Sequence, residues 1–277
     1  MRLRGIRRSR NVEVRRGGAG RAGGLGIVGL LVVLAIGYFT GIDVTPLLQG
    51  ASAPQTEQSR TVSEQDGELT QFSAQVLTTT EQVWDRVFEE QLGRQYVPPK
   101  LVIFANVTQS PCGGASGATG PFYCPADEKA YLDTAFFRTL DQRMGAGGDF
   151  AAAYVIAHEV AHHVQNQLGI LPRVNAARQQ ASQVEANALT VRLELMADCL
   201  SGIWASNVQG LMERGDLQEA LNAARKIGDD HLQRQAGRVP QPHTFTHGTS
   251  EQRARWFARG YESGAVGECD TFATDRL

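Results

Sequence analysis

The sequence has only four cysteines, and no two of them form a C-x-x-C pair. This absence argues against a zinc ribbon and against a thioredoxin-like redox site, because both depend on that spacing. Internal repeats are also absent, and the glycine-rich stretch at 17–26 does not follow a predicted strand. The sequence therefore gives no support for a repeat protein or for a nucleotide-binding loop.

Acidic residues are nearly missing from the first 22 positions. Eight of the 27 basic residues lie there but only one of the 29 acidic residues, so the rest of the chain holds 19 basic and 28 acidic residues. A basic tail on an acidic body argues against a body that binds nucleic acid. We therefore expect no nucleic-acid partner.

Charged residues are also missing from 24–42, a run of 19 mostly apolar residues. A helix of that length crosses a bilayer core of about 30 Å. The arginines lie on its amino-terminal side only, so the positive-inside rule predicts a cytoplasmic tail at 1–23 and an extracytoplasmic remainder. An alternative is cleavage at Ala51-Ser52-Ala53, which has the small-x-small form of a signal-peptide site. In both cases the body is exported, and we predict a single-pass protein of the cell membrane.

All four cysteines follow the apolar run, and an even number in an exported domain predicts two disulfides. Four cysteines allow three pairings. We favour Cys112–Cys124, which closes a short glycine-rich loop, and Cys199–Cys269, which ties the tail to a helix.

The composition beyond the apolar run divides the rest of the chain into a polar linker at 43–67 and a domain at 68–277. Apolar spacing and breakers predict more helices than strands in the domain. The predicted helices are 69–92, 149–168, 176–211 and 250–261, and the predicted strands are 101–104 and 129–137. We expect an α+β fold, rich in helix with a small sheet.

The predicted helix at 149–168 carries an H-E-x-x-H motif, formed by His158, Glu159 and His162. Residues four apart share one face of a helix, so both imidazoles can reach one zinc ion. Glu159 is rotated by about 100° from His158 and lies beside the metal, where it can accept a proton from water. His163 points away from His162, as a surface or supporting residue.

The motif leaves one ligand to be found. A third histidine six residues on is absent, because that position is Leu168. Glu185 and Glu194 both stand in apolar surroundings, and they are too far around a helix for both to face the metal. We favour Glu194, because Asp198 follows one turn later and can orient a zinc-bound histidine.

The sequence also resembles the bacterial membrane-anchored neutral zinc metallopeptidases over about 104–272. The matching stretches are GPFYCPAD at 120–127, HEVAHHVQ at 158–165, LELMADC at 193–199, THGTSEQR at 246–253 and CDTF at 269–272. This resemblance implies a zincin-like fold with Glu194 as the third ligand and Glu159 as the catalytic residue. It also implies a basic tail, a single span and an outer domain, but it does not name a substrate.

The sequence therefore predicts a peptidase with one zinc ion that hydrolyses peptide or protein substrates at the outer face of the membrane. Its alternative is a zinc-containing but inactive module that binds a partner at the cell surface. For the donor that stabilises the oxyanion we favour His247, which precedes a capping box at Thr249 and Gln252, over His243, Tyr154 and Tyr261. The strand at 129–137 is a candidate for binding substrate as an added β-strand.

Overall fold

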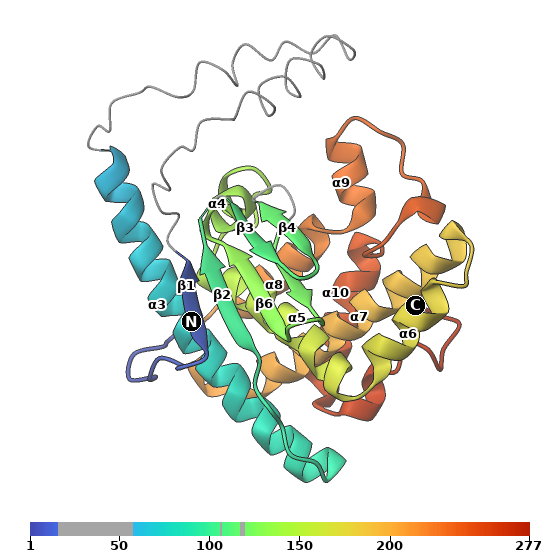
Figure 1. Cartoon of the computed structure of the whole chain (residues 1–277), viewed down its shortest axis with the longest axis horizontal. Helices are drawn as coiled ribbons and strands as arrows, with labels where there is room; N and C mark the ends of the chain where they lie inside the picture. The colour runs from blue at the N-terminus through green and yellow to red at the C-terminus, as the bar shows by residue number, and fades with distance from the viewer. Residues whose placement is uncertain (16–57, 106, 117–119) are drawn as a thin grey trace. The chain divides into compact units, whose positions relative to one another are not determined.

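The computed structural model describes residues 1–15, 58–105, 107–116 and 120–277 (Figure 1). They divide into two units: Met1–Arg15 with Leu69–Leu277 form the larger, and of the second, Arg16–Glu68, only the first turns of one helix are described. The predicted span at 24–42 lies outside the described residues. Among the helices that are described, none is both long enough and apolar enough to cross a bilayer.

The amino-terminal segment Met1–Arg15 is part of the larger unit, although the sequence predicted a tail at 1–23, of which residues 16–23 lie outside the described residues. Met1 and Leu3 are buried in the main core, while the arginines at 4, 7, 8 and 10 remain exposed. The segment then forms strand β1, Val12–Arg15, which pairs with a strand of the body. The dense positive charge suggested a free tail, but the apolar residues between the arginines pack.

The main sheet has four strands in the order β1-β2-β6-β5. Its further members are β2 (Lys100–Phe104), β6 (Lys129–Asp133) and β5 (Phe122–Cys124), and β3 (Val107–Ser110) and β4 (Gly113–Ser116) form a separate hairpin. β1, β2 and β6 are parallel, whereas β5 runs antiparallel to β6 and forms the edge. The side chains of β2 alternate between a large core and a small cluster on the opposite face.

The predicted strand at 129–137 ends early, at Asp133. The Asp133 carboxylate accepts a hydrogen bond from the Ala135 amide at 2.9 Å and so caps a helix that begins at Thr134. β6 also has a neighbouring strand on each side, so it has no free edge for a substrate. The edge beside the candidate site belongs to β5.

Helices make up most of the described residues. In chain order they are α3 (Gln58–Val87), the π-helix η1 (Phe88–Leu92), α4 (Thr134–Gln142), α5 (Asp149–Gln167), α6 (Ile170–Arg178), α7 (Gln183–Asn207), α8 (Asp216–Lys226), α9 (Asp229–Gln235) and α10 (Ser250–Ser263), with 3-10 turns η2 (Gln209–Leu211), η3 (Pro242–Thr244) and η4 (Val266–Cys269). The single helix predicted at 176–211 is two helices, because Ser182 and Glu185 form a capping box that starts α7. The α+β prediction is confirmed.

Helices α7 and α10 are in close contact because glycine lies on both sides of their interface. A Cβ atom on Gly202 would lie 2.1 Å from the Phe257 carbonyl oxygen, and one on Gly260 would lie 1.8 Å from the Cys199 carbonyl oxygen. No larger residue fits at either position without separating the helices. This contact joins the later part of α10 to the later part of α7, beyond Glu194 and Asp198.

Candidate metal centre

Helix α5 carries the H-E-x-x-H motif in a buried environment. Gly148 precedes the helix with φ of 120°, and Gly169 follows it with φ of 73°, so each end has a backbone conformation that favours glycine. His158 and Glu159 are 6% and 7% exposed. Buried polar groups of this kind are costly unless they have partners.

Glu194 of α7 faces both histidines across the interface between α5 and α7. One of its oxygens lies 3.1 Å from Nε2 of His158, and the other lies 3.5 Å from Nε2 of His162. Donor atoms of the three residues all lie within 4.8 Å of one another. Two imidazole nitrogens and a carboxylate form a donor set that suits zinc, with room for a further ligand.

The second nitrogen of each imidazole ring is also held. Nδ1 of His158 lies 2.9 Å from Oδ1 of Asp198, and Nδ1 of His162 lies 2.9 Å from Oε1 of Gln165. Gln165 is itself fixed, because its amide donates to the Leu193 carbonyl at 2.7 Å. Both rings therefore turn Nε2 toward Glu194, which is the orientation that metal-binding histidines need.

Asp198 is the centre of a buried network. Arg253 of α10 donates from Nε and from a terminal nitrogen to the two carboxylate oxygens, at 2.9 and 3.0 Å. Tyr154 donates its hydroxyl to the same carboxylate at 2.6 Å. Because Asp198 and Arg253 are both almost fully buried, the pair is a rigid support for His158 rather than a solvated ion pair.

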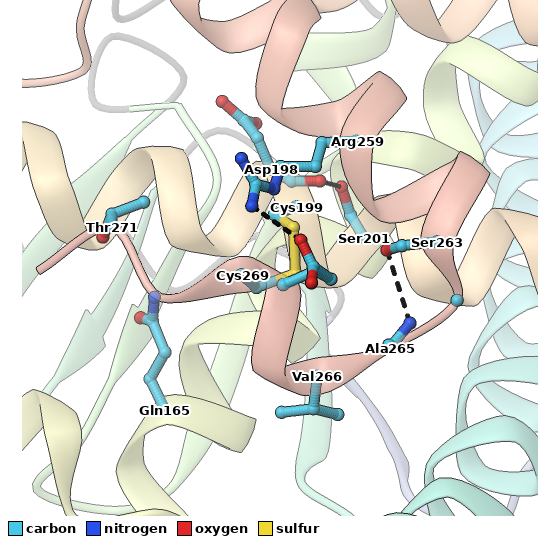
Figure 2. Close-up of a disulfide and its surroundings, with 12 residues drawn as sticks. Gln165, Asp198, Cys199, Ser201, Arg259, Ser263, Ala265, Val266, Cys269 and Thr271 are labelled. Carbon is cyan, nitrogen blue, oxygen red and sulfur yellow. Dashed lines mark hydrogen bonds and ion pairs between the residues drawn. A yellow bond between two sulfur atoms is a disulfide. The ribbon is translucent and has the colours of Figure 1, made fainter. Parts of the chain in front are cut away.

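The two predicted disulfides are both present, so that pairing is confirmed. Cys199, directly after Asp198, is bonded to Cys269 of η4 and so ties the carboxy-terminal segment to α7 (Figure 2). Cys112, in the turn of the β3–β4 hairpin, is bonded to Cys124 at the end of β5. One disulfide thus supports the helix that carries Glu194, and the other supports the edge strand.

The charges at the site are strongly coupled. Burial lowers the pKa of His158, but the charge of Asp198 and hydrogen bonds to Asp198 and Glu194 outweigh it and raise the pKa to about 10. Burial raises the pKa of Glu194, but the nearby His162 and His247 hold it well below its usual range. Burial raises the pKa of Glu159. Without a metal, the site therefore favours a protonated His158 beside an ionised Glu194.

The motif opens into a cavity of about 950 Å³. His158, Glu159, His162, Glu194 and His247 all contribute to its lining. The cavity is large enough for a segment of peptide, and Glu159 lines it beside the three candidate ligands.

His247 is held at the cavity by Asp229, the first residue of α9. One Asp229 oxygen accepts the backbone N–H groups of Thr246, His247 and Gly248, at 2.7, 2.6 and 3.0 Å. The other lies 3.3 Å from Nδ1 of His247. Nε2 of His247 has no hydrogen-bond partner among the described residues, so it is available to a bound molecule. The predicted capping box at Thr249 and Gln252 is present.

The competing candidates lie outside the cavity or have their polar group engaged by another residue. Glu185 is exposed and accepts hydrogen bonds from Ser182 at the start of α7. His243 is exposed on η3, and neither it nor Tyr261 lines the cavity. Tyr154 lines the cavity, but its hydroxyl is engaged, because it donates to Asp198.

Three supporting residues were not predicted: Arg253, Gln165 and Asp229. The positions of Arg253 and Gln165 offered a signal, since each is a polar residue on an otherwise buried helical face. His163 is buried rather than exposed, and its Nδ1 lies 2.9 Å from the Tyr123 hydroxyl. Asp229 offered no such signal, because its role depends on contact with His247, which lies 18 residues further along the chain.

Comparisons with known proteins agree with the motif. Residues 1–272 match the family described as "Putative neutral zinc metallopeptidase". The chain is 46% identical to Uncharacterized protein YpfJ of Escherichia coli K12, over 98% of this chain and 99% of that protein. It is 42% identical to Uncharacterized protein Rv2575 of Mycobacterium tuberculosis H37Rv, over 66% of this chain and 65% of that protein. No solved structure matches the chain.

Proposed function

We propose that this chain, which belongs to the family of putative neutral zinc metallopeptidases, hydrolyses peptide bonds with one zinc ion. The observation that carries this proposal is the convergence of His158, His162 and Glu194 beside Glu159 in an open cavity. These three residues would hold the metal. When bound there, zinc would polarise a substrate carbonyl and make water more acidic.

Glu159 is proposed as the general base. It lines the cavity, and it makes none of the contacts that orient the rings of His158 and His162. It is therefore free to accept a proton from water and to pass it to the leaving amine. Burial raises the pKa of its carboxyl, which brings the group closer to the value at which a base works best near neutral pH.

His247 is proposed as the donor to the oxyanion. Its backbone and Nδ1 are fixed by Asp229, Nε2 has no hydrogen-bond partner among the described residues, and the residue lines the cavity. A preorganised donor of this kind stabilises the charge that develops on the carbonyl oxygen. Asp229 would act as a positioning residue.

We propose that an extended substrate adds to the edge strand β5. Residues 120–123 line the cavity, and β5 has only β6 as a neighbour in the described sheet. An exposed strand edge offers unpaired N–H and C=O groups to a peptide. The disulfide at Cys124 would keep this edge in place.

The proposed location is an oxidising compartment outside the cytoplasm. Two disulfides with no free cysteine support it, because such bonds persist where thiols are not kept reduced. Since Met1–Arg15 and Leu69–Leu277 form one unit, the proposal places both segments on the same side of the membrane.

The test is cleavage of a peptide mixture by wild-type protein and by Glu159→Gln, with zinc measured in both. We expect cleavage by the wild type, a loss of at least about 10²-fold in the variant, and equal zinc content. Zinc in both proteins without cleavage by either would instead support the inactive binding module.

A further inference from the structure

His163 directly follows the candidate ligand His162, but it is not one of the three residues that converge as candidate ligands. Its side chain is buried, with 1% exposed, and both of its ring nitrogens have partners. Nε2 lies 2.7 Å from the carbonyl oxygen of Val97, and Nδ1 lies 2.9 Å from the hydroxyl of Tyr123. His163 therefore joins two segments that are distant in the sequence to helix α5.

The Val97 carbonyl determines the directions of these hydrogen bonds. A carbonyl oxygen can only accept, so Nε2 of His163 carries a hydrogen and donates it to Val97. In the neutral ring Nδ1 is then an acceptor, and the Tyr123 hydroxyl donates to it. The same hydroxyl accepts from the side-chain amide of Asn166 at 3.2 Å. Tyr123 lines the cavity, but its hydroxyl hydrogen is used by His163 and is not offered to a bound molecule.

The contact with Val97 is reinforced from the next turn of α5. Gln167 donates its side-chain amide to the Val97 carbonyl at 2.7 Å and accepts the Val97 N–H at 3.1 Å. Val97 lies three residues before β2, which has a neighbouring strand on each side in the main sheet. The ring of His163 therefore has a fixed orientation, and it presents Nδ1 to Tyr123 in one position.

Tyr123 is the middle residue of the edge strand β5, and its side chain lies on the face of the strand that meets α5. The side chains of a strand alternate between its two faces. Phe122 and Cys124 belong to the small cluster on the opposite face, where the ring of Phe122 stacks on that of Tyr131. The ring centroid of Tyr123 instead lies 5.5 Å from that of His163. The position of β5 along α5 therefore depends on the contact between Tyr123 and His163.

We infer that His163 is a positioning residue for the substrate: through Tyr123 it holds β5 at the place along α5 where a peptide paired with this edge reaches the metal site. This inference rests on the proposed peptidase function and on addition of the substrate to β5. His162 and His163 are consecutive residues of one helix, so a candidate metal ligand and the anchor of the strand keep a constant separation. A shift of β5 would move the paired peptide relative to the metal.

The test measures kcat, KM and zinc content for His163→Phe, Tyr123→Phe and the double variant, on an end-blocked hexapeptide that the wild type cleaves. Each single change keeps an aromatic ring and removes the hydrogen bond. We expect each to lower kcat/KM by at least about 10-fold, mainly through a higher KM. The double variant should be no worse than the poorer single variant, because both changes remove the same contact.

Zinc content should stay at the wild-type level in all three proteins, because Asp198 and Gln165, and not His163, contact the rings of the candidate ligands. His243→Phe is the matched control, since His243 is exposed and does not line the cavity. It should leave kcat and KM unchanged. If His163→Phe does not fold, Tyr123→Phe still decides, because it removes only a hydroxyl from a half-buried side chain.

Binding of a library of end-blocked hexapeptides to Glu159→Gln separates this inference from the proposed function. Weaker binding when Tyr123→Phe is added to Glu159→Gln would support the positioning role even if no peptide were cleaved. Cleavage with unchanged kcat/KM in both single variants, or effects that add in the double variant, would overturn the positioning role and leave the peptidase standing. Loss of zinc from His163→Phe would also overturn it, since the ring would then support His162. Absence of both cleavage and binding would overturn both proposals.

Discussion

Oδ1 of Asp198 lies 2.9 Å from Nδ1 of His158, and Arg253 donates two N–H groups to the same carboxylate. The imidazole of a candidate ligand on α5 is thus oriented by a residue of α7, which is oriented in turn by a residue of α10. This chain of contacts joins the three helices at the point where metal binding would need a fixed ring.

Asp198→Asn should weaken zinc binding by about 10–100-fold, because the amide no longer favours the ring orientation and loses its charge toward Arg253. Zinc affinity can be measured by competition with a chromogenic chelator. Asp85→Asn serves as control, since Asp85 is exposed on α3. Unchanged affinity in Asp198→Asn would mean that the carboxylate supports folding only.

Glu194→Ala should remove zinc at stoichiometric concentration, whereas Glu185→Ala should keep it. Glu194 faces both histidines, and Glu185 is exposed at the capping box of α7. Elemental analysis of the purified variants decides between them. Full zinc occupancy in Glu194→Ala would show that the third ligand has been misassigned.

Zinc uptake at pH 7 should release at least one proton. Asp198 and Glu194 outweigh burial and raise the pKa of His158 to about 10, so its ring is protonated at pH 7 in the metal-free protein. Zinc requires the neutral ring, so binding displaces that proton, and affinity should rise with pH up to about 10. Calorimetry in two buffers with different ionisation enthalpies gives the proton count. A heat of binding that is independent of the buffer would contradict this protonation state.

His247→Ala should lower kcat by roughly 10²–10³-fold, with zinc content and KM little changed, if the ring stabilises the oxyanion. His243→Ala is a matched control, because His243 is an exposed histidine of the same segment that does not line the cavity. A kcat equal to that of the wild type would return His247 to a purely structural role in its loop.

Local patterns predicted the parts of the site that local geometry determines. His158 and His162 follow from the spacing of one helix, and Glu194 and Asp198 follow from acidic residues one turn apart among apolar neighbours. Contacts between distant segments were not predictable in this way. Arg253 meets Asp198 where α10 packs on α7, and a sequence pattern does not reveal how these two helices pack.

The errors in the predicted fold arise where two sequence patterns favour different structures. The apolar alternation after Lys129 continued beyond Asp133, but capping by that carboxylate turned the chain into α4. The arginines among the first 15 residues led to the prediction that this segment is a tail. The parallel pairing of β1 with β2 joins positions almost 90 residues apart, and its register cannot be read from either strand alone.

Leu3→Ala should destabilise the larger unit, although position 3 was predicted to lie in a separate tail. Leu3 is 8% exposed in the same core as Trp84 and Leu101, so its truncation should cost about 2–5 kcal/mol and lower Tm by about 5 °C or more. Arg4→Ala, at an exposed neighbour, should leave Tm unchanged. An equal Tm for both variants would indicate that the segment does not pack on the body.

The same packing makes a prediction about the membrane. A single crossing by 24–42 would put Met1–Arg15 and Leu69–Leu277 on opposite faces, whereas in the structure β1 pairs with β2 and the two segments form one unit. If the body is exported, a membrane-impermeant thiol reagent applied to intact cells should therefore label Arg4→Cys, and it should label Asp85→Cys on the exposed face of α3 to a similar extent. Labelling of Asp85→Cys alone would support the predicted cytoplasmic tail and would contradict the pairing of β1 with β2. Labelling of neither position in intact cells, but of both after lysis, would place the whole unit inside and contradict the proposed location.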